Sequence, residues 1–176
     1  MRLRAAAAAA GLALSLSGCG YALVGKGTVI DPTIKRIGVP LFRDASGKPG
    51  LDQKITQKVV EELLKRGRFD VVADATGVDA LLEGEITTYA PRLAGVGGDT
   101  EGRSQANRYE IVLTARVRFS KLGARDPIWA NDAFTFRDEY DVGDNPQAFF
   151  DQESQAIDRL AVSFARSLVA TMLEAF

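Results

Sequence analysis

The chain has 176 residues, with 22 lysine and arginine side chains against 23 aspartate and glutamate side chains and a formal net charge of −1. A nucleic-acid-binding domain is normally strongly basic, so this balance excludes that class. The chain contains no histidine, which removes the commonest general base and the commonest metal ligand. With a single cysteine, no Cys-His pair, Ser-His-Asp triad or zinc cluster can be built. A hydrolase that uses paired carboxylates stays open.

The N-terminal residues have the pattern of an exported lipoprotein. Arg2 and Arg4 form a positive region, and residues 5–16 form an uncharged apolar run that is too short to cross a bilayer of about 30 Å. The segment Leu16-Ser17-Gly18-Cys19 resembles the lipobox of bacterial lipoproteins. This resemblance implies cleavage just before Cys19 and a covalent lipid on that residue. An ordinary signal peptide that leaves a free thiol is the alternative.

We therefore divide the chain into a signal peptide (1–18), a lipidated tether (19–33) and a single domain (34–176). Removal of Arg2 and Arg4 with the signal peptide leaves 20 basic against 23 acidic side chains, a net charge of −3. An anionic ligand must then be met by a local cluster of basic residues. We expect the anchor alone to hold the mature protein on the membrane, because no second apolar segment reaches the length of a membrane span.

The domain is predicted to begin with a βαβ unit. Residues 34–42 alternate as a strand, and Pro40 marks its end or an irregularity. The apolar residues of this strand that should share one face are Ile37, Val39 and Leu41. From residue 51 onward apolar positions recur every four residues, which predicts an amphipathic helix over residues 51–66, with Gly67 just beyond its end. Residues 69–72 then form a short strand parallel to the first.

Three longer strands are predicted next, over residues 80–89, 108–120 and 128–140. The middle strand alternates most strictly, which indicates one covered and one exposed face of an antiparallel sheet. Its inward side chains should be Tyr109, Ile111, Leu113, Ala115, Val117 and Phe119. The glycine-rich residues 91–106 between the first two strands are predicted to be a long loop, either functional or disordered.

The aromatic residues of the last strand leave one alternative open. Phe134 and Phe136 should point inward, which places Trp129 outward, at an interface, unless a β-bulge turns it into the core.

A final helix is predicted to begin at Asp144-Asn145-Pro146, with proline at the first helical position, and to keep an apolar stripe almost to residue 176. We expect its aromatic residues to be core residues and not a lipid groove; they are Phe149, Phe150 and Phe164. The predicted fold class is α+β, a two-layer sandwich in which two helices cover one face of a mixed sheet of four to five strands.

Several stretches, in order along the mature chain, share their motifs with one known family. They are residues 19–21, 35–42, 61–69, 80–86, 134–140 after Trp129, and Phe149-Phe150. Together they resemble the lipopolysaccharide-assembly lipoproteins of the outer membrane, whose fold is also a two-layer α/β sandwich. Each motif is short, and the specificity lies in the ordered set.

This resemblance implies a non-enzymatic subunit of the lipopolysaccharide translocon, held on the periplasmic side of the outer membrane by the lipid on Cys19, with no other cofactor. Its partners would be lipopolysaccharide and a large β-barrel, which it would plug and help to assemble. The absence of aspartate directly after Cys19 agrees with sorting to the outer membrane. The alternative is an envelope lipoprotein that scaffolds or activates a cell-wall or secretion machine without lipid cargo.

The candidate contacts to lipopolysaccharide are Arg116, Arg118 and Arg137, which the strand pattern places on the exposed face of the sheet. Lipid A carries phosphates, and guanidinium groups bind phosphate bidentately. The alternative is an ordinary solvated surface on which Glu83 and Glu85 pair with these arginines across the strands.

Substitution of the anchor residue tests the lipoprotein prediction. We expect Cys19→Ala to remain as unprocessed precursor or to become soluble, since lipidation at this position is the predicted attachment to the membrane. The measurement is incorporation of a radioactive fatty acid, and an undiminished label in the variant would contradict the prediction.

Overall fold

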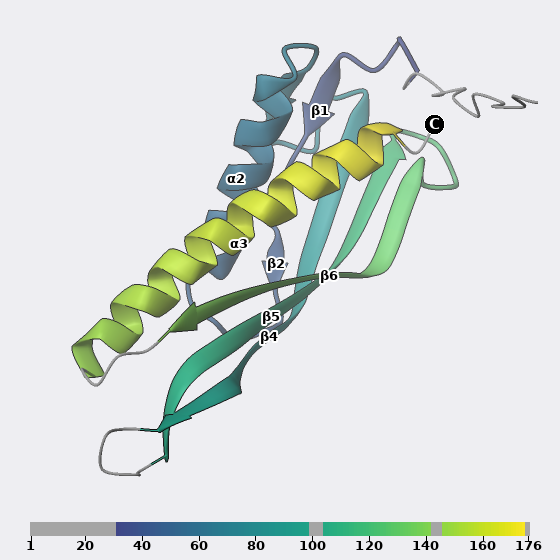
Figure 1. Ribbon diagram of the computed structural model, residues 1–176. Helices are drawn as coiled ribbons and strands as arrows, with labels where there is room; N and C mark the ends of the chain where they lie inside the picture. The colour runs from purple at the N-terminus through teal and green to yellow at the C-terminus, as the bar shows by residue number, and fades with distance from the viewer. Residues whose placement is uncertain (1–30, 99–103, 142–145, 175–176) are drawn as a thin grey trace, which may run out of the picture.

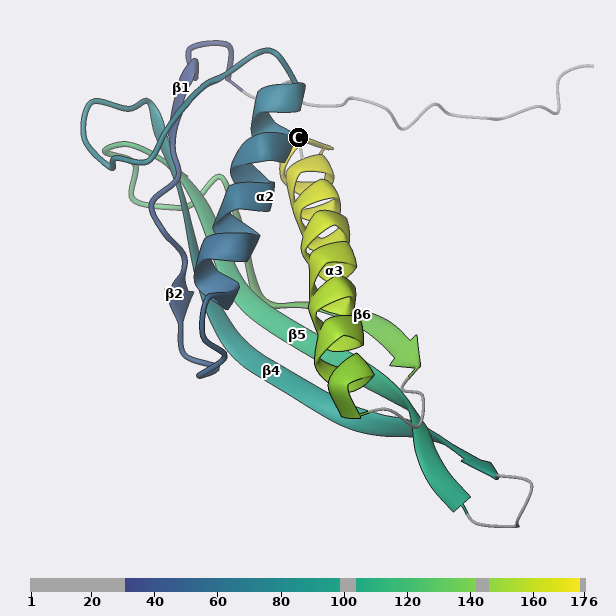
Figure 2. The same cartoon turned by 90° about the vertical axis from the view of Figure 1, so that its left-hand side faces the viewer.

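The computed structural model describes residues 31–98, 104–141 and 146–174. It has two layers, a mixed β-sheet and two helices that lie side by side on one face of it (Figure 1, Figure 2). The strand order is β3-β1-β4-β5-β6, and a short strand β2 also pairs with β4. The predicted α+β sandwich is confirmed. The signal peptide and most of the tether, including Cys19, lie outside the described residues.

The first elements form the predicted βαβ unit. Strand β1 (Arg36–Gly38) and strand β3 (Asp70–Val72) pair in parallel, and helix α2 (Leu51–Lys65) connects them. The helix begins at the predicted residue and ends one residue before the predicted end, with Arg66 as its C-cap. It has an acidic residue in its first turn and a basic residue in its last turn. Its apolar stripe is buried in the core through Leu51, Ile55, Val59 and Leu63.

The facing predicted for the first strand is wrong after Pro40. Leu41 is 57% exposed, whereas Phe42 is buried. Strand β2 (Arg43–Asp44) pairs with β4 again, but four residues (39–42) separate β1 from β2, opposite three residues of β4. The extra residue reverses which side chains face the core beyond it. Pro40 lies in this interruption and has no backbone N–H to donate to a hydrogen bond with β4.

A missing side chain on β4 makes room for the inverted Phe42. A Cβ atom on Gly84 would lie 2.2 Å from the ring of Phe42, so the ring occupies the space that any larger residue would need. The core beside β2 is therefore closed by Gly84 on β4 and by Phe42 just before β2.

Strands β4 (Ala80–Gly98), β5 (Ser104–Lys121) and β6 (Trp129–Asp141) form an antiparallel meander. The predicted loop over residues 91–106 is wrong, because β4 continues to Gly98 and β5 begins at Ser104. Cross-strand pairing overrides the low strand propensity of glycine here, and the register shifts next to Gly95 absorb the irregularity. The long β4–β5 hairpin extends beyond the helical layer (Figure 2).

The predicted facing of the three strands is confirmed. Of the two alternatives for Trp129, the structure shows the second, in which a β-bulge turns its side chain toward the core. The inward residues of β5 from Ile111 to Phe119 are fully buried in alternation. Strand β6 has one extra residue between Asn131 and Phe134 opposite β5. This bulge turns Trp129 to the inner face, where its ring meets Phe134 edge-on at 6.0 Å.

Helix α3 (Pro146–Glu174) crosses the sheet as a rod of about 44 Å. Phe164 is fully buried, and Phe149 packs partly buried against the core, as predicted. Phe150 is 69% exposed, so its assignment to the core is wrong; it lies next to Phe149 in the helix and points off the apolar stripe. The predicted capping residues before Pro146 lie outside the described residues. Among the helices that the structure describes, none is long and apolar enough to span a membrane.

A buried carboxylate fixes the first turns of α3 to the sheet. Glu153 is 8% exposed, and its Oε1 accepts hydrogen bonds from the Tyr89 hydroxyl of β4 (2.5 Å) and from Lys48 Nζ (2.9 Å). The Lys48 ammonium also lies 5.1 Å from the centre of the Tyr89 ring. Burial, followed by the hydrogen bond to Glu153, raises the pKa of Tyr89 well above its usual range.

Leu113 tests the facing of β5. It is fully buried, so Leu113→Ala should lower the free energy of unfolding by about 2–5 kcal/mol. Thr114→Ala, one position along, loses a hydroxyl contact to Thr135 on the open face (3.0 Å) and should cost much less. Denaturant unfolding measures both losses, and equal losses would contradict this facing of the strand.

Glu153 tests the attachment of α3. Glu153→Ala leaves the Tyr89 hydroxyl without its acceptor and should lower the free energy of unfolding by about 1–3 kcal/mol. Gln155→Ala on the exposed side of the same helix is the control, with an expected change of at most about 0.5 kcal/mol. Thermal melts that respond equally to both substitutions would contradict this role of Glu153.

Candidate functional site

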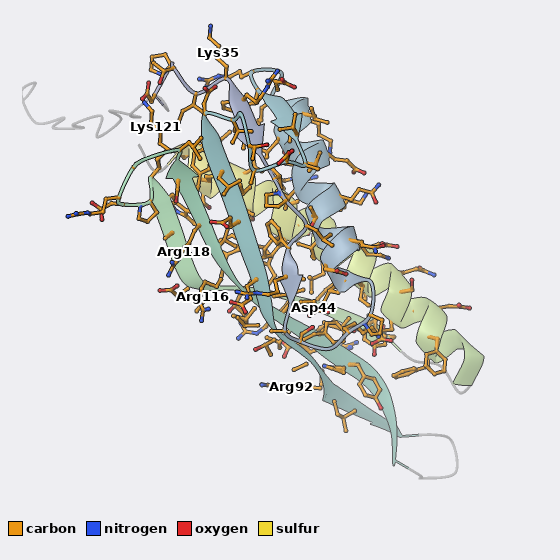
Figure 3. All side chains as sticks on the ribbon, turned by 180° about the vertical axis from the view of Figure 1, so that it is seen from behind. Lys35, Asp44, Arg92, Arg116, Arg118 and Lys121 are labelled. Atoms are coloured by element: carbon orange, nitrogen blue, oxygen red, sulfur yellow. The ribbon has the colours of Figure 1, made fainter. Side chains whose placement is uncertain are left out.

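The face of the sheet opposite the helices is open and charged. Figure 3 shows this face, with Arg116 and Arg118 on it at mid-height. Arg116 and Arg118 alternate along β5 with buried residues, and Arg137 lies opposite Val112 on β6, so all three predicted arginines project from this face. The predicted placement of the arginines on the exposed face is therefore correct.

Two of the three arginines have acidic partners. Arg116 forms ion pairs with Glu85 (2.8 Å) and Asp132 (3.5 Å), and Arg137 lies 3.7 Å from Glu110. Arg118 lies opposite Glu83 in the register, yet within the described part of the chain its guanidinium has no ion pair within 4.0 Å. The alternative of a paired surface therefore holds for Arg116 and Arg137 and not for Arg118.

Arg116 and Arg118 share one depression of about 530 Å³, and Arg137 lies outside it. The depression lies beside the interruption between β1 and β2, where Pro40 ends the pairing with β4. Its lining residues are Pro40, Leu41, Arg43, Glu83, Gly84, Glu85, Arg116 and Arg118. The structure thus adds two side chains that the sequence did not indicate, Arg43 and Leu41. The one signal in the sequence was Pro40, which suggested an irregularity there.

The electrostatics of the depression favour an anion. The Glu85 carboxylate forms ion pairs with both Arg43 (3.4 Å) and Arg116 (2.8 Å). The side chain of Glu85 is 20% exposed. Three guanidinium groups and two carboxylates line the depression, and Asp132 offsets part of the charge of Arg116, so the positive charge available to a ligand lies mainly at Arg118. Arg43 is 76% exposed and can rotate toward a ligand together with Arg118. An oxyanion with several acceptor oxygens, such as a phosphate, matches these donors.

An apolar wall lies directly beside the cations. Leu41 is 57% exposed and lines the same depression with Pro40. A ligand that combines an anionic group with an apolar group could therefore contact the arginines with the first and Leu41 and Pro40 with the second. Among the described residues, no group of three or more histidine, cysteine, aspartate or glutamate side chains could hold a metal ion.

The comparisons with known proteins agree on family and fold. The family model LptE, described as lipopolysaccharide-assembly, matches residues 34–172. No curated protein matches the chain. A lipoprotein B from Nitrosomonas europaea is similar in fold, with 12% identity, a TM-score of 0.53, and coverage of 88% of this chain and 90% of that one.

Two further solved structures share this fold. Protein XCC0632 from Xanthomonas campestris has 12% identity and a TM-score of 0.55, and covers 81% of this chain and 85% of its own. A minor lipoprotein from Acinetobacter baumannii has 12% identity and a TM-score of 0.50, with 81% and 92% covered. At such low sequence identity, the solved structures show only that the fold is shared. The family is shown by the family model, which matches nearly the whole described domain. The chain therefore belongs to the LptE family of lipopolysaccharide-assembly lipoproteins.

Proposed function

We propose that this protein is the lipidated subunit of the outer-membrane lipopolysaccharide translocon, and that it binds lipopolysaccharide in the depression on the open face of the sheet. It would be anchored through Cys19 on the periplasmic side, plug a large β-barrel partner and help it to assemble, without catalysing a reaction. Membership of the lipopolysaccharide-assembly family supports the general task. The depression supplies the specific support for lipid binding.

The observation that carries the proposal is Arg118, which has no ion pair among the described residues and lies beside Arg43 and the exposed Leu41. Lipid A combines phosphate groups with acyl chains, which matches guanidinium donors next to an apolar wall. The expected net charge of −3 on the mature chain gives no long-range attraction for an anion, and salt at about 0.15 M screens charges beyond about 8 Å. A short-range cluster is therefore the part of the molecule that can bind the phosphates.

The predicted arginines have unequal roles in this proposal. Arg118 contacts the phosphate first, Arg43 follows because it gives up only one longer ion pair with Glu85 (3.4 Å), and Arg116 contributes last because it holds both Glu85 (2.8 Å) and Asp132 (3.5 Å). Arg137 extends the cationic surface outside the depression. Reversal of Arg116, Arg118 and Arg137 to glutamate should still abolish binding, since it converts the whole face to negative charge.

A double variant tests the depression directly. Arg43→Glu with Arg118→Glu should weaken binding of purified lipopolysaccharide by about tenfold to a hundredfold at 0.15 M salt, from the loss of charge-assisted hydrogen bonds. The control is Arg125→Glu with Arg166→Glu, which changes the net charge equally at exposed sites away from the depression. Fluorescence titration gives the affinities, and wild-type affinity in the first variant would exclude this site.

The same variants separate cargo binding from the barrel partnership. We expect both to keep the wild-type melting temperature and to co-purify with a large outer-membrane β-barrel in mild detergent. Co-purification with a soluble or inner-membrane partner instead, together with no lipopolysaccharide binding by the wild type, would favour a scaffold or activator of another envelope machine.

A further inference from the structure

Strand β6 forms the longer of the two margins of the sheet. It has 13 residues and, within the described chain, pairs only with β5, whereas β3 at the other margin has three residues (Figure 2). The backbone N–H and C=O groups of an antiparallel strand alternate, residue by residue, between its two sides. Every second residue of β6 therefore directs these groups away from β5, where another strand could bind them.

Side chains of the protein itself occupy these groups at Glu139. The N–H of Glu139 donates to Asp138 Oδ1 (2.8 Å), and its carbonyl accepts a hydrogen bond from Arg159 Nη2 of α3 (3.1 Å). The Asp138 carboxylate also forms an ion pair with Arg159 Nε (3.0 Å). A further strand therefore cannot pair with Glu139 unless this arrangement opens.

The bulge of β6 is occupied in a similar way. The N–H of Ala133 donates to Asn131 Oδ1 (2.9 Å), and its carbonyl accepts a hydrogen bond from the Thr135 hydroxyl (3.2 Å). Bulges are also a common means by which a sheet edge avoids pairing. Any added strand is thus limited to the residues between Ala133 and Glu139.

The backbone groups of Thr135 and Arg137 are left available. Both residues alternate in step with Glu139, so their N–H and C=O groups point away from β5. Among residues 31–98, 104–141 and 146–174, these four groups form no hydrogen bond. Residues 135–137, the free edge segment, thus offer two donors and two acceptors to an extended chain.

The two sides of the free edge segment differ in character. Toward the helices, Phe134 and Phe136 are only partly buried, and the centres of their rings lie 5.3 and 5.6 Å from that of Phe164 on α3. Toward the open face, the side chain of Arg137 is 64% exposed. An added strand would cover the two phenylalanines with apolar side chains and place polar or acidic ones beside Arg137.

We propose that the free edge segment binds a short extended segment of the β-barrel partner, which adds a strand to the sheet beside β6. The inference rests on the proposed function, which supplies this partner. Main-chain hydrogen bonds give such a pairing its affinity, and alternate side chains give it specificity. The wall of a closed barrel has no free strand edge, so the bound segment is a loop or a terminal segment of the partner.

A second copy of this chain fits the edge less well. In an antiparallel pair of β6 strands centred on Phe136, the occupied groups of Ala133 and Glu139 would face one another, so no bonds would form beyond the free edge segments. Two Arg137 side chains would also lie diagonally opposite on the open face, and like charges across strands are unfavourable. A separate segment that carries an acidic residue avoids both costs.

Backbone amide exchange tests the pairing on the full chain, alone and in the complex that co-purifies with the large β-barrel in mild detergent. By NMR spectroscopy, the amides of Thr135 and Arg137 should exchange at least about tenfold more slowly in the complex, because each gains a hydrogen bond. The amide of Glu139 is already bonded and should change little. The amide of Arg125, exposed in the β5–β6 turn, reports the effect of enclosure alone.

Proline substitution removes one donor of the free edge segment. Thr135→Pro deletes an N–H that does not pair with β5, and an edge strand accepts proline at such a position. Thr135→Ala, which loses the same hydroxyl but keeps the N–H, is the matched control. In competition with the wild type for the purified β-barrel, Thr135→Pro should bind about tenfold more weakly than Thr135→Ala. Arg137→Pro against Arg137→Ala repeats the comparison if thermal melting shows that Thr135→Pro does not fold.

Other outcomes would overturn the inference. Equal competition by the proline and alanine variants, or equal slowing at Thr135, Arg137 and Arg125, would do so and leave the proposed function intact. Slow exchange at Thr135 and Arg137 in the chain alone would show that this chain or a second copy occupies the edge. If no β-barrel co-purifies, the proposed function fails and the inference fails with it.

Discussion

The structure depends on burying one face of a twisted sheet under a single layer of helices. The inward side chains of β5 have no exposed area, and α3 completes their burial through residues such as Phe164 and Leu168. The opposite face has no second layer within the described chain, so it must carry polar and charged side chains. A charged open face is thus a consequence of the fold. What indicates a ligand is the local departure from charge balance, at Arg118 beside the break after Pro40.

The parts of the fold that follow from local periodicity could be predicted from the sequence. Helix α2 follows one repeat, as does strand β5 from Ile111 to Phe119, and their fully buried residues follow from it. The segment 91–106 could not be predicted in this way. Its glycines favour a loop locally, but pairing between β4 and β5 along the chain decides its conformation, and this information lies in no short window.

Two further differences come from single extra residues. One lies between β1 and β2, where it exposes Leu41, and one lies in β6, where it turns Trp129 inward. Each inverts the facing of the side chains beyond it, because the period of a strand is two. The sequence showed an irregularity at Pro40 but not its direction, so Arg43 could not be assigned to the site. Whether Arg118 is paired depends on side-chain geometry, which a strand pattern does not contain.

The depression depends on how β4 meets its two neighbours. On one side its ladder with β1 and β2 is interrupted over four residues, and on the other side the register with β5 places Glu85 opposite Arg116. The extra residue of the interruption turns Leu41 outward and Phe42 inward. Phe42 closes the core against Gly84, while Leu41 forms the apolar wall beside the cations. The packing of the core and the shape of the depression therefore follow from the same local irregularity of the chain.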